Sequence, residues 1–390
     1  MQGHPPDLDA ERVDGAAGSH YRAPMSASGH DDTLPVVLFA AAFYAGFTLL
    51  ALALHGWNPL WFVWIGERYA SGDPHGLTGY DGQFIYFLAR DGWAGIVHLD
   101  NPPYRLQRIL YPLLTRTLSG GNATAIPWVM IAINAVSILV ATFLVTRWLV
   151  AQGLARWWGL VYPLFVGTFF AYSRDLTEPL ACALALAGVL AWLGERWAGG
   201  VALLALACLA RETMALFVLG LGLAALWRRQ WARAAAVASA CLPMLAWQVY
   251  IAAAVGAIPL TRSAPFSFVP AAAFFSDLSL EPGRVSALLF IDLPLLALAP
   301  VVVGGLVRNP SQPAVWLLAV QWAFLLISPP VMHQHVFETS RISTSLLLAL
   351  LLTFPRRAPA VRAAVASWSI LPTAVGLAPG LWWAPWTAKF

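Results

Sequence analysis

Charged residues are scarce in this chain of 390 residues. Asp, Glu, Lys and Arg make up only 11% of it and hydrophobic residues make up 59%, whereas soluble domains have about a quarter charged residues. So little charge cannot cover a surface that faces water on all sides, so the composition excludes an ordinary soluble domain. It predicts that lipid covers much of the chain, and the 19 Trp residues suit the boundary between membrane and water.

Lysine and cysteine are also nearly absent. Lys389 is the only lysine, and a net charge of +4 is too small to indicate a nucleic-acid partner. The chain lacks the GxxxxGK[ST] loop of nucleotide-binding proteins, a GxGxxG after a strand and the GxSxG of serine hydrolases. The cysteines lie in apolar runs without a CxxC pair, which indicates small core residues. They are Cys182, Cys208 and Cys241.

Long apolar runs follow a polar beginning. Residues 1–33 are expected to form a disordered cytoplasmic tail, and residues 34–390 an all-α, polytopic integral membrane helix bundle of about eleven transmembrane helices. Several runs are shorter than the roughly 20 residues that a helix needs to cross a bilayer. The runs are 34–54, 126–146, 157–172, 177–194, 199–210, 213–226, 233–255, 285–306, 312–328, 341–354 and 361–382.

The arginines predict the orientation of these runs. If the tail is cytoplasmic and each run crosses once, the later cytoplasmic segments hold ten arginines and one acid, Glu195. This is the positive-inside distribution of multi-pass proteins of the inner (plasma) membrane, and it leaves the C-terminus periplasmic. Joining 199–210 to 213–226 would break it, so we expect two helices with Arg211 and Glu212 at an outer turn. The ten arginines are Arg147, Arg156, Arg196, Arg228, Arg229, Arg233, Arg308, Arg356, Arg357 and Arg362.

The first outer loop, residues 55–125, carries the most distinctive residues. It begins with several tryptophans and is expected to contain interfacial helices. Asp81 lies between turn-forming residues and a helix-like run. Two interpretations stay open: a helix cap, or a carboxylate at the lipid–water boundary that acts as a general base on a sugar-acceptor hydroxyl.

Three arginines on the expected outer face of the membrane are candidates for binding phosphate. Arg105 and Arg108 are three residues apart and would share one face of a helix. Their planar guanidinium groups can bind phosphate oxygens in pairs, although they also suit contact with lipid headgroups. Arg341 lies at the mouth of a predicted span and is the third candidate.

Further ionisable residues fall in short outer turns at membrane depth, where such groups usually face the protein interior or a wet cavity. Structural ion pairing is the alternative role. His333, His335 and Glu338 have the spacing H-x-H-x-x-E, which matches no strong zinc pattern, so no metal or other cofactor is predicted. The residues expected to line a cavity are Tyr80, Gln83, Tyr104, Arg174, Asp175, Glu178, Arg211, Glu212, His335 and Glu338.

Four motifs carry a family resemblance. They are Tyr-Asp-Gly-Gln-Phe-Ile-Tyr at 80–86, Tyr-Arg-Leu-Gln-Arg-Ile-Leu-Tyr-Pro at 104–112, Thr-Glu-Pro-Leu at 177–180 and Ala-Arg-Glu-Thr at 210–213. With a long loop after the first span, they make the chain resemble GT-C-type glycosyltransferases over residues 34–350. The arrangement is closest to bacterial proteins similar to the GPI mannosyltransferase II-like group.

This resemblance implies a membrane hexosyltransferase of the cell envelope. It would move a sugar from a polyprenyl-phosphate-linked donor to a glycan, lipid or protein acceptor on the periplasmic face. Asp81 would be the catalytic base, and Arg105, Arg108 and Arg341 would stabilise the departing phosphate. No Asp-Asp or Glu-Asp pair follows the first span and the loop has no DxD, so the motifs do not support a divalent metal.

Two other functions remain open. A transporter or flippase of a lipid-linked glycan would also place arginines in a wet cavity, but the sequence shows no inverted repeat with matched broken helices. A non-enzymatic subunit of an envelope assembly complex would use the same charges for structure alone. Replacement of Asp81 by Asn would separate these functions. A transferase should lose turnover yet keep lipid binding, whereas a scaffold should be unaffected.

Overall fold

The computed structural model describes residues 30–276, 279–354 and 357–376, and the regular structure in these ranges is entirely helical. The all-α prediction is therefore confirmed for the described residues. Five helices are long and apolar enough to cross a membrane, and four more are apolar but shorter, so the count of eleven spans stays a prediction. The five are Thr33–Leu54, Ile126–Ala151, Trp231–Val255, Pro282–Arg308 and Val336–Thr353.

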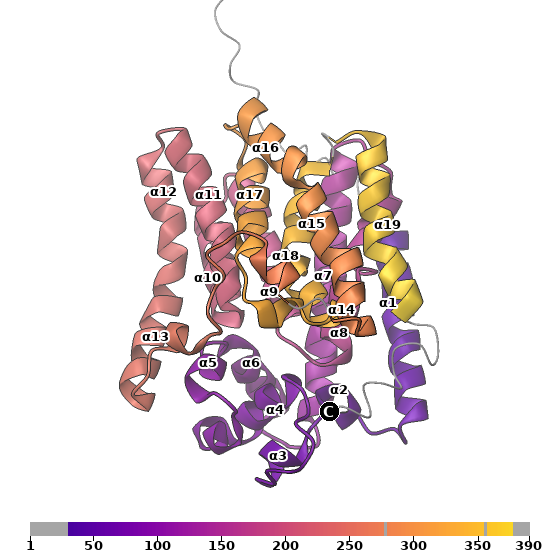
Figure 1. Cartoon of the computed structure of the whole chain (residues 1–390), viewed down its shortest axis with the longest axis vertical. Helices are drawn as coiled ribbons and strands as arrows, with labels where there is room; N and C mark the ends of the chain where they lie inside the picture. Colours follow the sequence, from indigo (N-terminus) through magenta and orange to yellow (C-terminus); the bar gives the residue numbers. More distant parts are fainter. Residues whose placement is uncertain (1–29, 277–278, 355–356, 377–390) are drawn as a thin grey trace, which may run out of the picture.

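The long helices lie side by side along the long axis of the molecule (Figure 1). α7 packs between α1 and α9, α9 packs against α10, and α18 packs against both α8 and α17. The helices of this bundle are α1 (His30–Leu54), α7 (Ile126–Ala151), α8 (Val166–Ser173), α9 (Glu178–Leu193), α10 (Trp197–Ala210), α11 (Ala215–Trp227), α17 (Pro313–Leu326), α18 (Val336–Thr353) and α19 (Pro359–Gly376).

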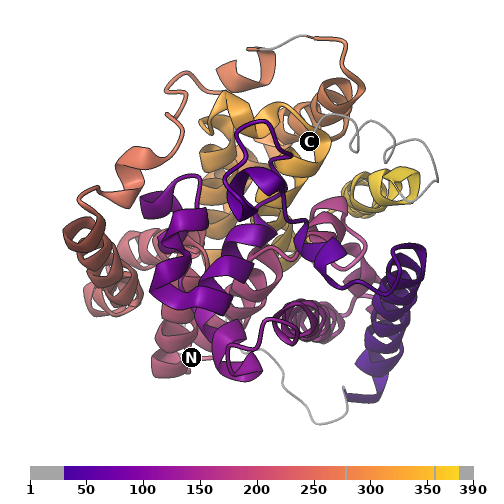
Figure 2. The ribbon, with the colours of Figure 1, turned by 90° about the horizontal axis from the view of Figure 1, so that it is seen from below.

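Residues 55–125, here called the loop layer, fold into short helices across one end of the bundle (Figures 1 and 2). The helices expected in the first outer loop are thus present. Which side of a membrane this layer faces stays a prediction. The layer contains α2 (Leu60–Val63), α3 (Glu67–Ala70), α4 (Gly82–Asp91), α5 (Pro102–Leu106) and α6 (Leu110–Ser119).

Residues 199–226 form two helices, as the arginine distribution predicted. α10 ends at Ala210, Arg211 is extended with φ −158°, and a 3-10 turn over Glu212–Met214 leads into α11. This turn lies against the loop layer, because Arg108 of the layer pairs with Glu212. The charge argument therefore located a turn that hydropathy alone left ambiguous.

Other predicted runs differ from the structure at their ends or in their middle. α1 begins at His30, inside the expected tail, and residues 1–29 lie outside the described residues. α18 begins at Val336 rather than 341, so Arg341 lies within the helix and not at its mouth. The run 233–255 is α12 (Trp231–Ala238), a 3-10 turn and α13 (Leu242–Val255).

The run 285–306 is interrupted in a similar way. It consists of α14 (Pro282–Ala287), a π-helical turn over Leu288–Asp292, α15 (Leu293–Ala297) and α16 (Ala299–Arg308). A proline in the first turn of a helix is tolerated because the missing N–H has no intrahelical partner there. Prolines occupy this position in α14, α15 and α16. The prolines therefore lie where the three helices of this run begin.

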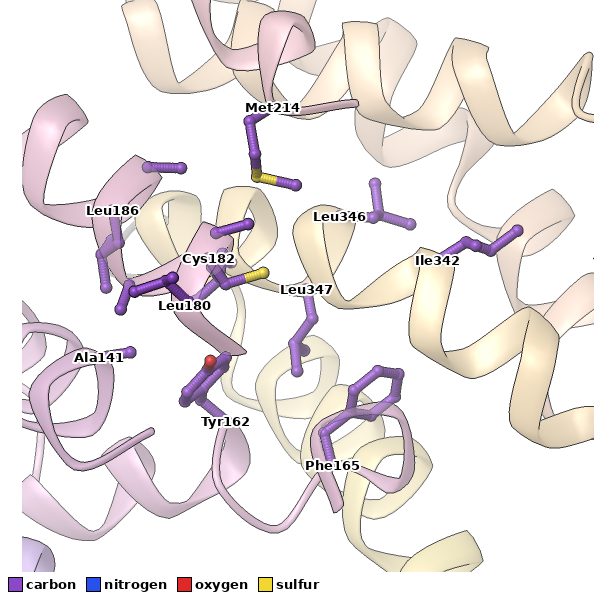
Figure 3. Packing of buried hydrophobic residues seen from close by; sticks show 14 of the residues in the cluster. Ala141, Tyr162, Phe165, Leu180, Cys182, Leu186, Met214, Ile342, Leu346 and Leu347 are labelled. Carbon is purple, nitrogen blue, oxygen red and sulfur yellow. The ribbon is translucent and has the colours of Figure 1, made fainter. Parts of the chain in front are cut away.

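The apolar core lies where the middle helices meet (Figure 3). Ala141 of α7, Leu186 of α9 and Leu347 of α18 are buried there, as is Met214 beside α11. Burial inside such a bundle leaves a helix without a polar face, which fits the nearly continuous apolar runs of α9 after Glu178 and of α18 from Leu346 to Leu352. The core fixes the positions of α9 and α18, whose ends next to the loop layer carry the charged residues described below.

Glycine allows two of these helices to come very close. A Cβ added to Gly167 of α8 would overlap the carbonyl oxygen of Ser340 on α18, whereas one added to Gly46 of α1 would meet nothing within 4 Å. We expect Gly167→Ala to destabilise the protein by about 1–3 kcal/mol through overpacking. Gly46→Ala is the matched control and should be neutral or slightly stabilising.

The measurement is the apparent unfolding temperature of the purified full-length chain in detergent. Gly167→Ala should lower it by several degrees and Gly46→Ala should not. Equal temperatures for the two variants would show that α8 and α18 are not in the close contact described.

Candidate active site

Asp81 lies between two arginines from distant parts of the chain. Its Oδ1 lies 3.0 Å from Arg105 Nη1, and its Oδ2 accepts a hydrogen bond of 2.9 Å from Arg341 Nη1. Asp81 occupies the N-cap position of α4, but its side chain makes no capping hydrogen bond. The helix-cap interpretation is therefore wrong, because ion pairs and not the helix end hold this carboxylate.

The arginines keep Asp81 ionised. Burial on its own would raise the pKa of the Asp81 carboxyl, because a buried charge loses water. The positive charges of Arg105, Arg341 and Arg108 outweigh burial and hold the pKa well below its usual range. A carboxylate whose pKa is held this low is a weak base.

Arg105 is fixed on three sides. Its Nε and Nη2 donate to Oδ1 and Oδ2 of Asp100 at 2.8 and 2.7 Å, and its guanidinium lies 4.4 Å from the centre of the Phe84 ring. Sequence reasoning missed Asp100 as a site residue, although it lies in the same run as Arg105. A two-pronged bond of this kind sets the plane of the guanidinium as well as its position.

A second group of charges adjoins the first on α9 and α18. Glu178 Oε1 lies 2.7 Å from Arg211 Nη1 and 3.6 Å from Arg341 Nε. The side chains of Glu178 and Arg211 are each only 4% exposed, so this pair is almost completely removed from water. Glu338, on the first turn of α18, interacts electrostatically with Arg341 and Asp81. Arg341 therefore connects the carboxylates of α9 and of the loop layer.

The remaining pair joins the loop layer to the turn between α10 and α11. Arg108 donates from Nε and Nη2 to the two carboxylate oxygens of Glu212 at 2.9 and 2.7 Å, and its Nη2 also donates to the Tyr104 hydroxyl at 2.6 Å. Arg108 lies beyond the end of α5, yet it lines the same cavity as Arg105. The expectation that the two arginines share one face of a helix is therefore wrong, because α5 ends at Leu106, but both side chains line the same cavity.

Two cavities meet at this cluster, and Glu178 lines both. The first comprises about 350 Å³ of space that is partly open to solvent, and Asp81 forms part of its wall. The second comprises about 250 Å³ of space that is also partly open. The first is lined by Asp81, Phe84, Ile85, Leu88, Arg105, Arg108, Pro112, Leu176, Thr177 and Glu178. The second is lined by Glu178, Cys182, Arg211, Thr213, Met214, Phe324, Arg341, Ile342 and Ser345.

Tyr80 and Gln83, which flank Asp81, have different surroundings. The Arg341 guanidinium lies 5.4 Å from the centre of the Tyr80 ring, so Tyr80 adjoins the cluster. Gln83 is buried, accepts from the backbone N–H of Gly66 at 3.0 Å and donates to the carbonyl of Thr78 at 2.6 Å. Gln83 therefore stabilises the preceding turn of the loop layer through these two hydrogen bonds.

Arg174 and Asp175 form a separate buried turn before α9. The Arg174 guanidinium lies 4.8 and 4.6 Å from the ring centres of Trp61 and Trp64. The Asp175 carboxyl is fully buried, with the amide of Asn134 donating to it at 3.3 Å, and burial raises its pKa well above the usual range. Neither residue lines either cavity, so the structure does not bring them into the site as the sequence predicted.

The two histidines near α18 point to different partners. His333 is buried and its ring lies 2.8 Å from Asp292 Oδ1 and 2.6 Å from Ser328 Oγ. His335 occupies the N-cap position of α18, where its side chain accepts a backbone N–H, and burial lowers its pKa to about 4. Among the described residues no three His, Cys, Asp or Glu side chains gather in a way that could hold a metal ion.

The Arg108–Glu212 pair offers a direct test of how the loop layer is attached. We expect a double-mutant cycle with Arg108→Ala and Glu212→Ala to give a coupling free energy of about 2 kcal/mol, because the pair is largely buried and two-pronged. The Arg90–Asp91 pair on α4 is about one-third exposed and serves as control, with an expected coupling below about 1 kcal/mol.

Reversible unfolding of the full-length chain in mixed micelles gives the four free energies of each cycle. A coupling at Arg108–Glu212 no larger than that at Arg90–Asp91 would show that this contact does not hold the layer to the bundle.

Comparison with known proteins assigns this chain to no family. No protein-family model matches the chain, and neither a curated protein nor a solved structure matches it. The resemblance to GT-C-type glycosyltransferases therefore depends on the four motifs alone and stays a prediction.

Proposed function

We propose that this chain is a glycosyltransferase that moves a sugar from a polyprenyl-phosphate-linked donor to an acceptor hydroxyl. The observation that carries the proposal is a carboxylate, Asp81, held between Arg105 and Arg341 at the wall of a cavity. The arginines supply the charge that a phosphate leaving group needs, and the carboxylate supplies the base that a sugar acceptor needs.

The two arginines would exchange one anion for another when the donor binds. The donor phosphate takes over Arg105 and Arg341, which releases the Asp81 carboxylate from both ion pairs. Loss of these positive neighbours raises the pKa of Asp81 toward its ordinary value, so the carboxylate becomes a stronger base only when a donor is present. This order of events also keeps the base inactive in the empty protein.

The transfer itself is a single displacement. Asp81 removes the proton from the acceptor hydroxyl while the acceptor oxygen attacks the anomeric carbon. The bond from that carbon to the phosphate oxygen breaks, and the lipid phosphate leaves with the electron pair, so the configuration is inverted. Arg105, Arg108 and Arg341 stabilise the charge that develops on the phosphate. A phosphate leaves without being protonated, so one carboxylate suffices where hydrolysis of an ordinary glycosidic bond needs two.

The lining of the first cavity suits a sugar. Its wall combines charged residues with Phe84, Ile85 and Leu88, and sugar rings likewise have both polar edges and apolar faces. A sugar unit is therefore the proposed transferred group.

The proposal includes a place in the cell. About eleven spans in the inner (plasma) membrane, with a cytoplasmic N-terminus and a periplasmic C-terminus, would put the loop layer on the periplasmic face. Nucleotide sugars are confined to the cytosol, so an enzyme with its site on that face needs a donor already carried across by a lipid. The arginine distribution supports this orientation.

The test replaces Asp81 by Asn and, as a matched control, replaces Asp91 by Asn at the other end of α4. Asp81→Asn should lower the rate of sugar transfer by at least about 100-fold, as expected for loss of a general base. Asp91→Asn should leave the rate unchanged, because Asp91 pairs with Arg90 at the far end of α4. The assay follows release of farnesyl phosphate from farnesyl-phosphate hexoses by the purified full-length chain.

Binding separates the competing functions in the same preparations. Asp81→Asn should bind farnesyl phosphate at least as tightly as the wild type, because Arg105 and Arg341 have lost their carboxylate. Full transfer by Asp81→Asn would contradict the mechanism. Transport of a lipid-linked glycan across vesicles by the wild type, without transfer, would favour a flippase.

A further inference from the structure

The turn between α11 and α12 lies at the end of the bundle opposite the loop layer (Figure 1). It consists of Arg228, Arg229 and Gln230, and α12 begins at the next residue. The Arg233 guanidinium, on the first turn of α12, lies 4.5 Å from the centre of the Trp197 ring and donates to the Gln230 side chain at 3.3 Å. Arg228, Arg229 and Arg233, here called the turn arginines, therefore gather beside the start of α10.

The turn arginines are not compensated by negative charge. Within the part of the chain that the structure describes, none of them pairs with a carboxylate, and Glu195 before α10 forms no ion pair with them. Burial, and after it the positive charge of Arg233, lower the pKa of Arg228. Arg108 and Arg284, by contrast, each face a carboxylate. Like charges held together without a partner favour the binding of an anion.

Exposed tryptophans surround the turn arginines. Trp227, Trp231 and Trp197 are 58%, 67% and 39% exposed, and the Trp227 ring lies 5.9 Å from the ring of Trp316 on α17. Indole rings are enriched where a membrane meets water, because the ring is apolar and its N–H is polar. This end of the bundle therefore suits the level of lipid headgroups.

An exposed apolar face continues from the turn along α11. Leu226 and Leu219 are two helical turns apart, so they lie on the same face of the helix. They are 40% and 50% exposed. A molecule with an anionic group at the turn can place an apolar chain along this face. The turn and α11 thus offer positive charge and apolar surface in the order in which a phospholipid presents its headgroup and acyl chains.

We propose that the turn arginines bind the headgroup of an anionic phospholipid whose acyl chains lie along α11 and α12. Guanidinium N–H groups bind phosphate oxygens in pairs, and the negative charge of the headgroup offsets the repulsion among the arginines. A zwitterionic headgroup suits the turn less, because it also presents a cation. The inference does not rest on the proposed function, since the turn lies at the other end of the bundle from Asp81.

The lipid would stabilise a weakly packed edge of the bundle. Only 28% of the span Trp231–Val255 is buried inside the protein, against 83% of Val336–Thr353. A headgroup held by arginines from the end of α11 and the start of α12 would connect the two helices beside α10. Because a ligand that binds only the folded state raises its stability, anionic lipid should also raise the apparent unfolding temperature.

Native mass spectrometry of the full-length chain in detergent measures the affinity for each lipid. We expect dioleoyl-phosphatidylglycerol to bind at least about tenfold more tightly than dioleoyl-phosphatidylcholine, because each arginine near an anionic headgroup favours it. The double variant Arg228→Gln with Arg233→Gln should reduce this preference to about threefold or less. Arg308→Gln is the matched control, since Arg308 is a single exposed arginine in the last turn of α16, and it should keep the full preference.

Hydrogen exchange of the wild type does not depend on any variant folding. Replacing phosphatidylcholine by phosphatidylglycerol in nanodiscs should slow the exchange of backbone amides in residues 227–233. It should leave the amides of residues 307–312, around Arg308, unchanged.

Four results would overturn the inference. The first is equal affinity of the wild type for the two lipids, and the second is a preference that survives both substitutions at the turn. The third is an equal loss of preference in Arg308→Gln, which would indicate a general charge effect and not a site. The fourth is displacement of phosphatidylglycerol by millimolar inorganic phosphate, which would show that the turn arginines bind free phosphate and not a lipid.

Discussion

The ion pair between Asp81 and Arg341 joins two parts of the chain that are 260 residues apart. Asp81 begins a helix of the loop layer and Arg341 lies within α18, which the apolar core holds in the middle of the bundle. Arg341 also reaches Glu178 on α9, so one guanidinium links the layer to two core helices. The geometry of both cavities depends on this contact, because its residues form part of the wall of each.

Charge compensation explains how so many charged side chains are buried together. Buried charges are tolerated when each has a partner, and here Arg105, Arg108 and Arg211 each face a carboxylate. Such a network has a structural role in itself, since removing one member leaves another uncompensated. It also suits exchange, because an incoming phosphate replaces one anion by another and adds no unpaired charge. Function and stability therefore draw on the same contacts in this account.

Apolar runs predicted where helices lie but not where several of them break or begin, and the arginine distribution placed the turn at Arg211. The sequence also grouped Asp81, Arg105 and Arg341 as candidates for one site, and in the structure the three side chains are in contact. Contacts between residues far apart in the sequence could not be predicted from local patterns. The Trp61 and Trp64 rings hold Arg174, and Asp292, 41 residues away, holds His333. Nothing in the neighbouring sequence specifies such partners. Position alone also misled at Asp81, where a cap-like location suggested a helix cap although the side chain bonds to arginines.

The central claim is that a lipid phosphate replaces Asp81 as the partner of Arg105 and Arg341. The most direct measurement is a cryo-electron microscopy map of the full-length chain in nanodiscs with farnesyl phosphate added. We predict phosphate density within hydrogen-bond distance of both arginines, with the Asp81 carboxylate separated from at least one of them. Lipid phosphate density elsewhere, with both Asp81 ion pairs unchanged at about 3 Å, would contradict the account.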